Sequence, residues 1–286
     1  DCRAPDVVGR LMDGQDAACV WTDPPYGVSY QAASGKHLAI RNDEKTGDEL
    51  AGSLLISAFV QGMLHSLPAA AWYIWHAAEA AEAFRFAIAA AGLQVLQTIV
   101  WTKNNHVQGW ADYHWAHEPC FYACRQGCRP TWHAGRDQTT AWRLAVDTSA
   151  EISAALGTGL ELQDGAGNSL FLSPRPPGRT VRSFRLQEGQ SMRVQSDSAR
   201  ADAWQVSRDH QVAHPTQKPV ELALRAIRNS TAPGAVVYDP FAGSGACILA
   251  AEQSGRLARC CELEPVHCDA IVQRWERMTG KTATRT

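Results

Sequence analysis

A short strand that ends in two consecutive prolines constrains the fold of this chain more than any other feature. Cys19–Trp21 is apolar and typical of a buried strand, and Asp23, Pro24 and Pro25 follow it closely. Each proline fixes its own φ at about −65° and drives the residue before it into an extended conformation. Asp23 and Pro24 therefore cannot continue a helix or a central strand. We predict a rigid loop that directs the Asp23 carboxylate and the Pro24 carbonyl at one point.

Such a loop suits a planar substrate that carries hydrogen-bond donors. The exocyclic amino group of a nucleobase is one candidate, because its lone pair is delocalised into the ring and it reacts poorly until its hydrogens are held. Asp23 and the Pro24 carbonyl would accept those hydrogens, and the Tyr26 ring would stack on the base. Taken alone, these residues equally fit a proline-rich turn capped by an aspartate.

Length and composition bound the remaining possibilities. The 286 residues suit one large domain or a domain with an insertion, and a hydrophobic fraction of 45% supplies a full core. No run of 18 uncharged apolar residues predicts a membrane span, and no signal peptide opens the chain. Nine cysteines favour a reducing, cytosolic setting, and a start at Asp1 without methionine predicts a fragment. With a net charge of −2, any nucleic-acid contact must come from local patches.

Apolar strands alternate with helices along much of the chain. This alternation predicts an α/β fold with a mostly parallel sheet and helices on both faces. Residues 27–50 are polar and predict a loop beside the site, either one that closes on substrate or an ordinary solvated one. The expected helices are 6–12, 54–67 and 79–91, and the expected strands are 17–21, 71–75, 95–101 and 121–123.

A second strand that leads into a glycine-rich turn lies near the C-terminus. Val236–Asp239 runs into Pro240–Gly245, and the helix Ala246–Gln253 follows. Glycines allow close approach of the backbone to a ligand, and the helix N-terminus offers free N–H groups. The turn has no Gly-Lys-Ser/Thr and no third glycine of the dinucleotide type, which disfavours a triphosphate or a pyrophosphate.

Two acidic residues accompany this turn. Asp239 suits a ligand that carries positive charge, such as an amino-acid ammonium. The strand Ala258–Leu263 comes next and carries Glu262, 23 positions after Asp239. Glu262 is placed to accept hydrogen bonds from ribose hydroxyls.

Three cysteines and two histidines raise the question of a metal site. Cys120, Cys124 and Cys128 lie near His114 and His117, but three residues fill each gap between the cysteines. Zinc and iron–sulfur sites usually contain a two-residue gap. Positions four apart share one face of a strand, so Cys120 and Cys124 are more simply small core residues. We predict no metal.

Residues 146–205 differ in character from the rest and predict a β-rich insertion, with candidate strands at 170–172 and 180–186. The segment from Phe171 to Arg200 has two acidic residues, Glu188 and Asp197, and six arginines: Arg175, Arg179, Arg182, Arg185, Arg193 and Arg200. This excess could follow a phosphate backbone. A solvated insertion or an oligomer contact fits as well.

Three motifs together carry a family resemblance. Asp23-Pro24-Pro25-Tyr26, then His214–Pro219, then Asp239–Gly245 resemble an S-adenosylmethionine-dependent DNA amino-methyltransferase of the beta group. The resemblance implies a Rossmann-like catalytic domain formed by residues 1–145 and 206–286. The insertion at 146–205 lies where the group usually carries its target-recognition region. The resemblance also implies a restriction–modification setting in the cytoplasm of a bacterium, or a phage gene.

The resemblance implies roles by matching position. Glu262 would hold the cofactor's ribose, and Lys218 would neutralise its carboxylate. Two simpler alternatives stay open: Gly245 permits helix–strand packing, and Lys218 is a solvated residue in the first turn of a helix running to Arg228. The residues implied at the base are Asp23, Pro24, Pro25 and Tyr26. Those implied at the cofactor are Asp239, Pro240, Phe241, Ala242, Gly243, Gly245, Glu262, Thr216, Lys218, Asp1 and Cys2, and those implied at DNA are Arg175, Arg179, Arg182, Arg185 and Arg193.

The expected reaction is methylation of the adenine N6 amino group in double-stranded DNA, by base flipping and direct in-line transfer from S-adenosylmethionine. Asp23 stands where cytosine-amino enzymes more often have serine, which favours adenine; cytosine N4 is the alternative. A catalytically silent nucleic-acid-binding module and an iron–sulfur enzyme using the same cofactor also stay open. A homodimer is a possible assembly.

Overall fold

The computed structural model of the chain describes residues 1–27, 49–107, 112–142, 160–163, 169–172, 193–195 and 217–285. The chain divides into two compact units. The first comprises Asp1–Trp142 and Arg208–Thr286, and the second comprises Arg143–Ser207. Most of the loop expected at 27–50 lies outside the described residues. Among the described helices, none combines the length and apolar character that crossing a membrane requires.

The first unit is built on a seven-stranded sheet with the order β10-β9-β1-β2-β4-β3-β5. Among its described strands, four of the six neighbouring pairs are parallel, and β4 runs antiparallel to both β2 and β3. The sheet is therefore mixed, although mostly parallel as predicted. Its strands are β1 (Ala17–Thr22), β2 (Ser66–Trp75), β3 (Leu93–Val107), β4 (Trp115–Arg125), β5 (Ala141–Trp142), β9 (Val236–Asp239) and β10 (Leu257–Cys260).

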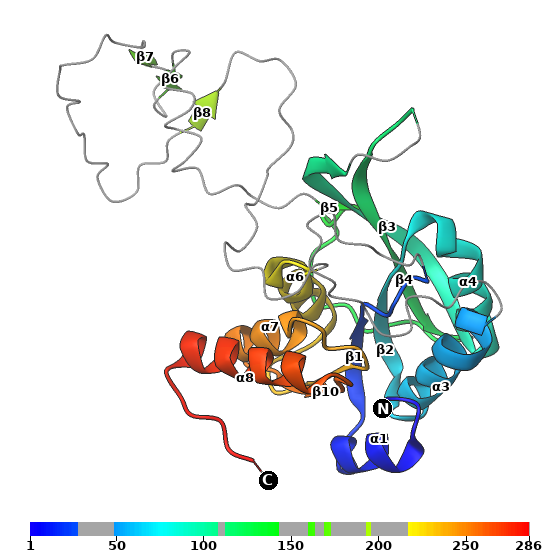
Figure 1. Ribbon diagram of the computed structural model, residues 1–286. Helices are drawn as coiled ribbons and strands as arrows, with labels where there is room; N and C mark the ends of the chain where they lie inside the picture. Colours follow the sequence, from blue (N-terminus) through cyan, green and yellow to red (C-terminus); the bar gives the residue numbers. More distant parts are fainter. Residues whose placement is uncertain are drawn as a thin grey trace. The chain divides into compact units, whose positions relative to one another are not determined.

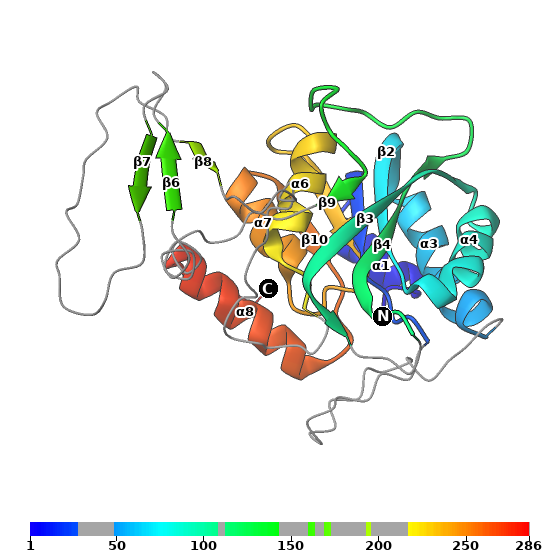
Figure 2. The ribbon, with the colours of Figure 1, turned by 90° about the horizontal axis from the view of Figure 1, so that it is seen from above.

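Helices cover both faces of this sheet, which confirms the predicted α/β class. Helices α3 and α4 lie on one face, and α6, α7 and α8 lie on the other (Figures 1 and 2). The helical elements are α1 (Pro5–Met12), η1 (Leu50–Leu55), α3 (Ile56–Leu64), η2 (Ala78–Ala80), α4 (Ala81–Ala90), α6 (Val220–Ser230), α7 (Ala246–Ser254) and α8 (Pro265–Thr279).

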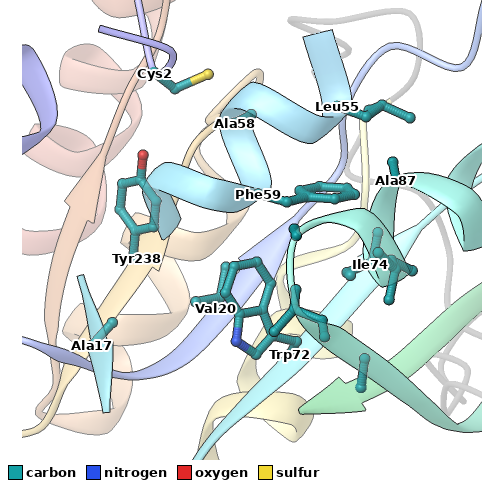
Figure 3. Close-up of a cluster of buried hydrophobic side chains, with 14 of the residues drawn as sticks. Cys2, Ala17, Val20, Leu55, Ala58, Phe59, Trp72, Ile74, Ala87 and Tyr238 are labelled. Carbon is teal, nitrogen blue, oxygen red and sulfur yellow. The ribbon is translucent and has the colours of Figure 1, made fainter. Parts of the chain in front are cut away.

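The alternation of side chains along β1 and β2 fills two separate cores. Val20 and Trp72 point toward α3, where Phe59 packs edge-on against Trp72 with ring centroids 6.2 Å apart (Figure 3). Trp21 points the other way and meets Trp75 with ring centroids 5.4 Å apart. Successive residues of a strand face opposite sides. Both faces of this sheet are therefore apolar, and the strands read as continuous hydrophobic runs.

The prediction of a helix at 54–67 is wrong at its C-terminal end. Helical structure ends at Leu64, and the strand β2 already begins at Ser66. Tertiary contacts explain this difference, because Ser66 pairs with Ala17 of β1 and its carbonyl accepts a hydrogen bond from Arg125. The proline at position 68 lies within the strand, where the register between β1 and β2 shifts.

The second unit contains a three-stranded antiparallel sheet with the order β7-β6-β8. Its strands are β6 (Leu160–Gln163), β7 (Ser169–Leu172) and β8 (Arg193–Gln195). The strand expected at 170–172 corresponds to β7. The strand expected at 180–186 lies outside the described residues.

Candidate functional site

The carboxyl ends of the parallel strands meet at one edge of the sheet. From β1 the chain passes to β2 on one side, and from β9 it passes to β10 on the other. Neighbouring strands whose connections diverge in this way leave a crevice at their carboxyl ends, where α/β proteins bind ligands. Asp23 follows β1, Asp239 ends β9, and Glu262 follows β10. All three line one cavity of about 400 Å³.

The Asp23 carboxylate accepts three hydrogen bonds from side chains of this cavity. The Tyr26 hydroxyl donates to its Oδ1 atom at 2.5 Å. The Lys218 ammonium donates to Oδ1 at 2.9 Å and to Oδ2 at 2.8 Å. The structure thus brings together three of the sequence-predicted residues, with Pro24 and Pro25 beside them in the cavity wall. Their roles toward a base stay predictions.

Lys218 is buried, with only 4% of its side chain exposed, and it precedes α6. The alternative of a solvated residue in the first helical turn is therefore wrong. Its ammonium also donates to the Tyr26 hydroxyl at 2.9 Å and lies 3.0 Å from Oε2 of Glu118. Its role at a cofactor carboxylate stays a prediction, but the structure gives the ammonium these other partners.

Sequence reasoning missed Glu118 and Lys103. Glu118 forms ion pairs with Lys218 and with Lys103 on β3. Glu118 reaches the site because of the direction of β4. This strand runs antiparallel to β2, so its first residues lie at the carboxyl edge of β2, where Cys120 pairs with Trp75. A fully parallel sheet would have placed Glu118 at the opposite edge. The signal in the sequence is an acidic residue immediately before the apolar run 119–124.

Burial and charge shift the pKa values of this cluster in different directions. Burial raises the pKa of the Asp23 carboxyl above its usual range, and the Lys218 ammonium limits the rise. Burial alone would also raise the pKa of Glu118, but Lys218 and Lys103 outweigh it and lower that pKa. Burial alone would lower the pKa of Lys218, but the two carboxylates raise it. Lys218 therefore stays charged.

The glycine-rich turn forms the other wall of the cavity. Asp239 is 2% exposed, and its Oδ1 atom accepts a hydrogen bond from the Phe241 N–H at 3.0 Å. Burial raises the pKa of Asp239 well above its usual range, and the charges of Asp23 and Glu262 add to this. A buried carboxyl group among other acids favours a cationic ligand, because positive charge would restore its ionised form. Pro240, Ala242 and Gly243 line the cavity with it.

Glu262 ties the strand β10 to this turn. Its Oε2 atom accepts a hydrogen bond from the Gly243 N–H at 2.7 Å, and its Oε1 atom accepts from Leu263 N at 2.9 Å and Glu264 N at 3.0 Å. A carboxylate has about four acceptor positions. Glu262 is therefore held by the backbone and still has capacity for a donor from a ligand.

Gly245 has a structural requirement of its own. Its φ is +79°, and a Cβ atom would lie 3.0 Å from the side chain of Ile271 on α8. Glycine is therefore needed both for the backbone conformation and for the packing of α8 against the turn. This supports the packing alternative, and its role at a cofactor stays a prediction.

The N-terminal residues reach the same cavity. Asp1, Cys2 and Arg3 line it, and the Asp1 carboxylate pairs with Arg3 at 2.6 Å. Cys2 is buried, which raises the pKa of its thiol to about 12. A contact of Asp1 and Cys2 with an adenine stays a prediction.

Several predicted site residues lie outside the described residues: Thr216, Arg175, Arg179, Arg182 and Arg185. Arg193 lies on β8, but its side chain is likewise outside the description.

The cysteines weighed as metal ligands belong to β4 and the turn after it. Cys120 and Cys124 are buried, and the Cys124 thiol donates to the carbonyl of Cys128 at 3.2 Å. Within the described part of the chain, one group of three possible ligand atoms lies together, at Asp239, Cys247 and Cys260, all within 4.8 Å of one another. The expectation of no metal stays a prediction.

Both a family model and a curated protein are similar to this chain in sequence. A family model described as "DNA methylase" matches residues 17–273. A curated protein of Escherichia coli (strain K12), named "Putative methylase YubD", is 56% identical over 43 residues, which cover 15% of this chain and 19% of that protein.

Solved structures resemble most of the chain. M1.HpyAVI in complex with SAM has a TM-score of 0.53 at 15% identity, covering 94% of each chain. TTHA0409 from Thermus thermophilus, complexed with S-adenosyl-L-methionine, has a TM-score of 0.52 at 18% identity, covering 97% of this chain and 91% of that one. The cytosine-N4-specific PvuII DNA methyltransferase has a TM-score of 0.57 at 13% identity, covering 94% and 83%. At these identities the likeness shows the fold alone.

Proposed function

Because the chain belongs to the DNA methylase family, we propose that it methylates the exocyclic N6 amino group of adenine in double-stranded DNA. Without the choice between adenine and cytosine, the function is that of an S-adenosylmethionine-dependent DNA methyltransferase of the N6/N4 family. The observation that supports methyl transfer to an amino group is the juxtaposition of Asp23 with the acidic turn at Asp239 in one cavity of about 400 Å³. That volume lies within the range of small-molecule sites, roughly 300–1,000 Å³.

The residues of the cavity fit the cofactor. Glu262 is anchored by Gly243 and keeps capacity for a ribose hydroxyl. The buried carboxyl group of Asp239 suits the ammonium of the methionine part. When bound, S-adenosylmethionine supplies a methyl group on a positively charged sulfur, which an amino nitrogen can take directly.

The residues around Asp23 would prepare the amino group. A base inside a duplex cannot reach the cavity, so it must leave the stack first. Asp23 and the Pro24 carbonyl would accept the amino hydrogens and turn the nitrogen lone pair toward the methyl group, while Tyr26 would contact the ring. Lys218 and the Tyr26 hydroxyl hold the Asp23 carboxylate in place for this task.

Product analysis tests the proposal directly. The chain, S-adenosylmethionine carrying a labelled methyl group and DNA of mixed sequence are expected to yield N6-methyladenine after digestion to nucleosides. Adenine is favoured because Asp23 occupies the first position of the motif. N4-methylcytosine as the product would overturn the choice of base, and unlabelled DNA would overturn the activity. Mapping the modified positions would give the recognition sequence.

Glu262→Ala is expected to weaken S-adenosylmethionine binding by about 1.5–3 kcal/mol, the usual value of a hydrogen bond to a charged group. The loss arises from the ribose contact and from the freed Gly243 N–H. Calorimetric titration measures it, with Asp269→Ala, an exposed carboxylate on α8, as the matched control. Equal affinity in both variants would place the ribose elsewhere.

We also propose that the second unit contacts DNA through its arginines. Replacing Arg179, Arg182 and Arg185 with alanine is expected to weaken binding to all DNA sequences. The slope of log affinity against log salt should flatten by up to about 0.9 for each phosphate that the variant no longer binds. An unchanged slope with a changed mass in light scattering would instead indicate a dimer contact. Unchanged slope and mass together would leave these arginines as solvated surface.

A further inference from the structure

Lys218 is shared between two carboxylates that come from distant segments. Its Nζ atom lies 2.8 Å from Oδ2 of Asp23 and 3.0 Å from Oε2 of Glu118, and it also donates to the Tyr26 hydroxyl at 2.9 Å. An ammonium group has three N–H donors. Asp23 and the Tyr26 hydroxyl accept hydrogen bonds from the ammonium. The contact with Glu118 is an ion pair without a hydrogen bond, in a place where the lysine side chain is 4% exposed.

Glu118 connects this lysine to a second one. Its other carboxylate oxygen, Oε1, pairs with Lys103, and its side chain is 21% exposed. The charges therefore alternate along a row: Lys103, Glu118, Lys218, Asp23. In a poorly hydrated site, a change of charge at one member of such a row alters the bonding of the others.

We propose that Glu118 is a positioning residue for methyl transfer, because it shares Lys218 with Asp23 and so sets how strongly Asp23 accepts the hydrogens of the amino group. The inference rests on the proposed function of Asp23. Lys218 contacts both oxygens of Asp23, and full pairing with the ammonium would weaken that carboxylate as an acceptor for a third donor. Glu118 competes for the same ammonium and limits this pairing.

Two substitutions with opposite consequences test the inference. Glu118→Gln removes a negative charge near Asp23, and Lys103→Gln removes the positive charge that partly neutralises Glu118. A nearby negative charge raises the pKa of a carboxyl group, and a positive one lowers it. The acid limb of the single-turnover rate against pH should therefore move to lower pH in Glu118→Gln and to higher pH in Lys103→Gln. The other titratable groups that face Asp23, namely Tyr26, Cys120, Lys218 and Asp239, are the same in both variants.

The rate on the pH plateau supplies a second readout. Glu118→Gln is expected to slow single-turnover transfer about 10- to 100-fold, by analogy with the loss of an outer-shell partner that orients a metal ligand. Affinity for S-adenosylmethionine should stay unchanged. Glu118→Asp keeps the charge, and its acid limb should stay near that of the parent chain; it also preserves the test if Glu118→Gln does not fold.

A measurement without substrate separates this inference from the proposed function. Titration of carboxyl ¹³C resonances in aspartate-labelled protein follows Asp23 directly, with Asp23→Asn identifying its signal. If the titration midpoint of Asp23 moves to lower pH in Glu118→Gln and to higher pH in Lys103→Gln, the inference is supported, whether or not DNA is methylated. Displacements in one direction, or none, overturn it. Absence of methyl transfer by the parent chain, with the displacements present, would overturn only the proposed function.

Discussion

Asp23→Asn is expected to lower the rate of methyl transfer at least about 100-fold, in line with the loss of a positioned polar group. Asparagine keeps the size of the side chain but replaces one acceptor with an N–H₂ donor. That donor would face the Lys218 ammonium or the amino group of the base, and both are donors themselves. The negative charge that holds Lys218 would also be lost.

Single-turnover methylation with saturating cofactor measures this effect. S-adenosylmethionine affinity should change little, because Asp239 and Glu262 lie on other segments. Tyr26→Phe is the matched control, since it removes one donor to Asp23 and keeps the ring; we expect a smaller loss of rate. A near-normal rate for Asp23→Asn would remove Asp23 from its assigned role.

Lys218→Met is expected to lower the free energy of unfolding strongly. It leaves Asp23 and Glu118 without their shared cation in a buried place. Removing one partner of a buried ion pair costs about 3–5 kcal/mol, because an uncompensated charge remains. Methionine keeps the length and apolar character of the side chain, so the loss of packing should be small. Urea unfolding measures the change in the free energy of unfolding.

The deficit of Lys218→Met should depend on pH. Without Lys218, burial and the negative charge of Glu118 would raise the pKa of Asp23 in the folded state further above its unfolded value than in the parent chain. A carboxyl group with a raised folded pKa weakens the fold as pH rises through that pKa. The deficit should therefore be smaller at about pH 5 than at about pH 8.

Lys281→Met provides the control for this stability change. Its ion pair with Glu252 is 2.7 Å long, but 62% of the Lys281 side chain is exposed. A solvated pair of this kind contributes at most about 1 kcal/mol. Equal destabilisation by the two substitutions would show that burial of Lys218 does not matter.

Local sequence patterns were sufficient where structure depends on neighbouring residues. The strand before Asp23, the helix at Pro5–Met12 and the turn after Asp239 lie where their apolar spacing and their prolines and glycines predict. The α/β class follows from the same alternation. The end of α3 could not be predicted in this way, because pairing of Ser66 with Ala17 determines it across nearly fifty residues.

The site was predictable only in part for a related reason. Asp23, Asp239 and Glu262 lie at or just after the carboxyl ends of strands that run in one direction, so their meeting at one edge follows from a parallel sheet. Glu118 comes from the antiparallel strand β4, whose direction no local pattern reveals. Lys218 could be placed next to Asp23 only by knowing that α6 packs on the sheet beside β1, since 195 residues separate the two in sequence.

That separation affects how the chain is made. During synthesis the strands β1 to β4 emerge long before Lys218 and β9. Until then β1 lacks the neighbour that pairs with Cys19 and Val20, and an apolar strand at a sheet edge is prone to pair with other chains. Asp23 and Glu118 meanwhile lack the ammonium that joins them. The segment from Lys218 to β9 therefore covers the edge of β1 and supplies the positive charge between Asp23 and Glu118 at the same time. Chaperone dependence should be greatest for nascent chains that end before β9.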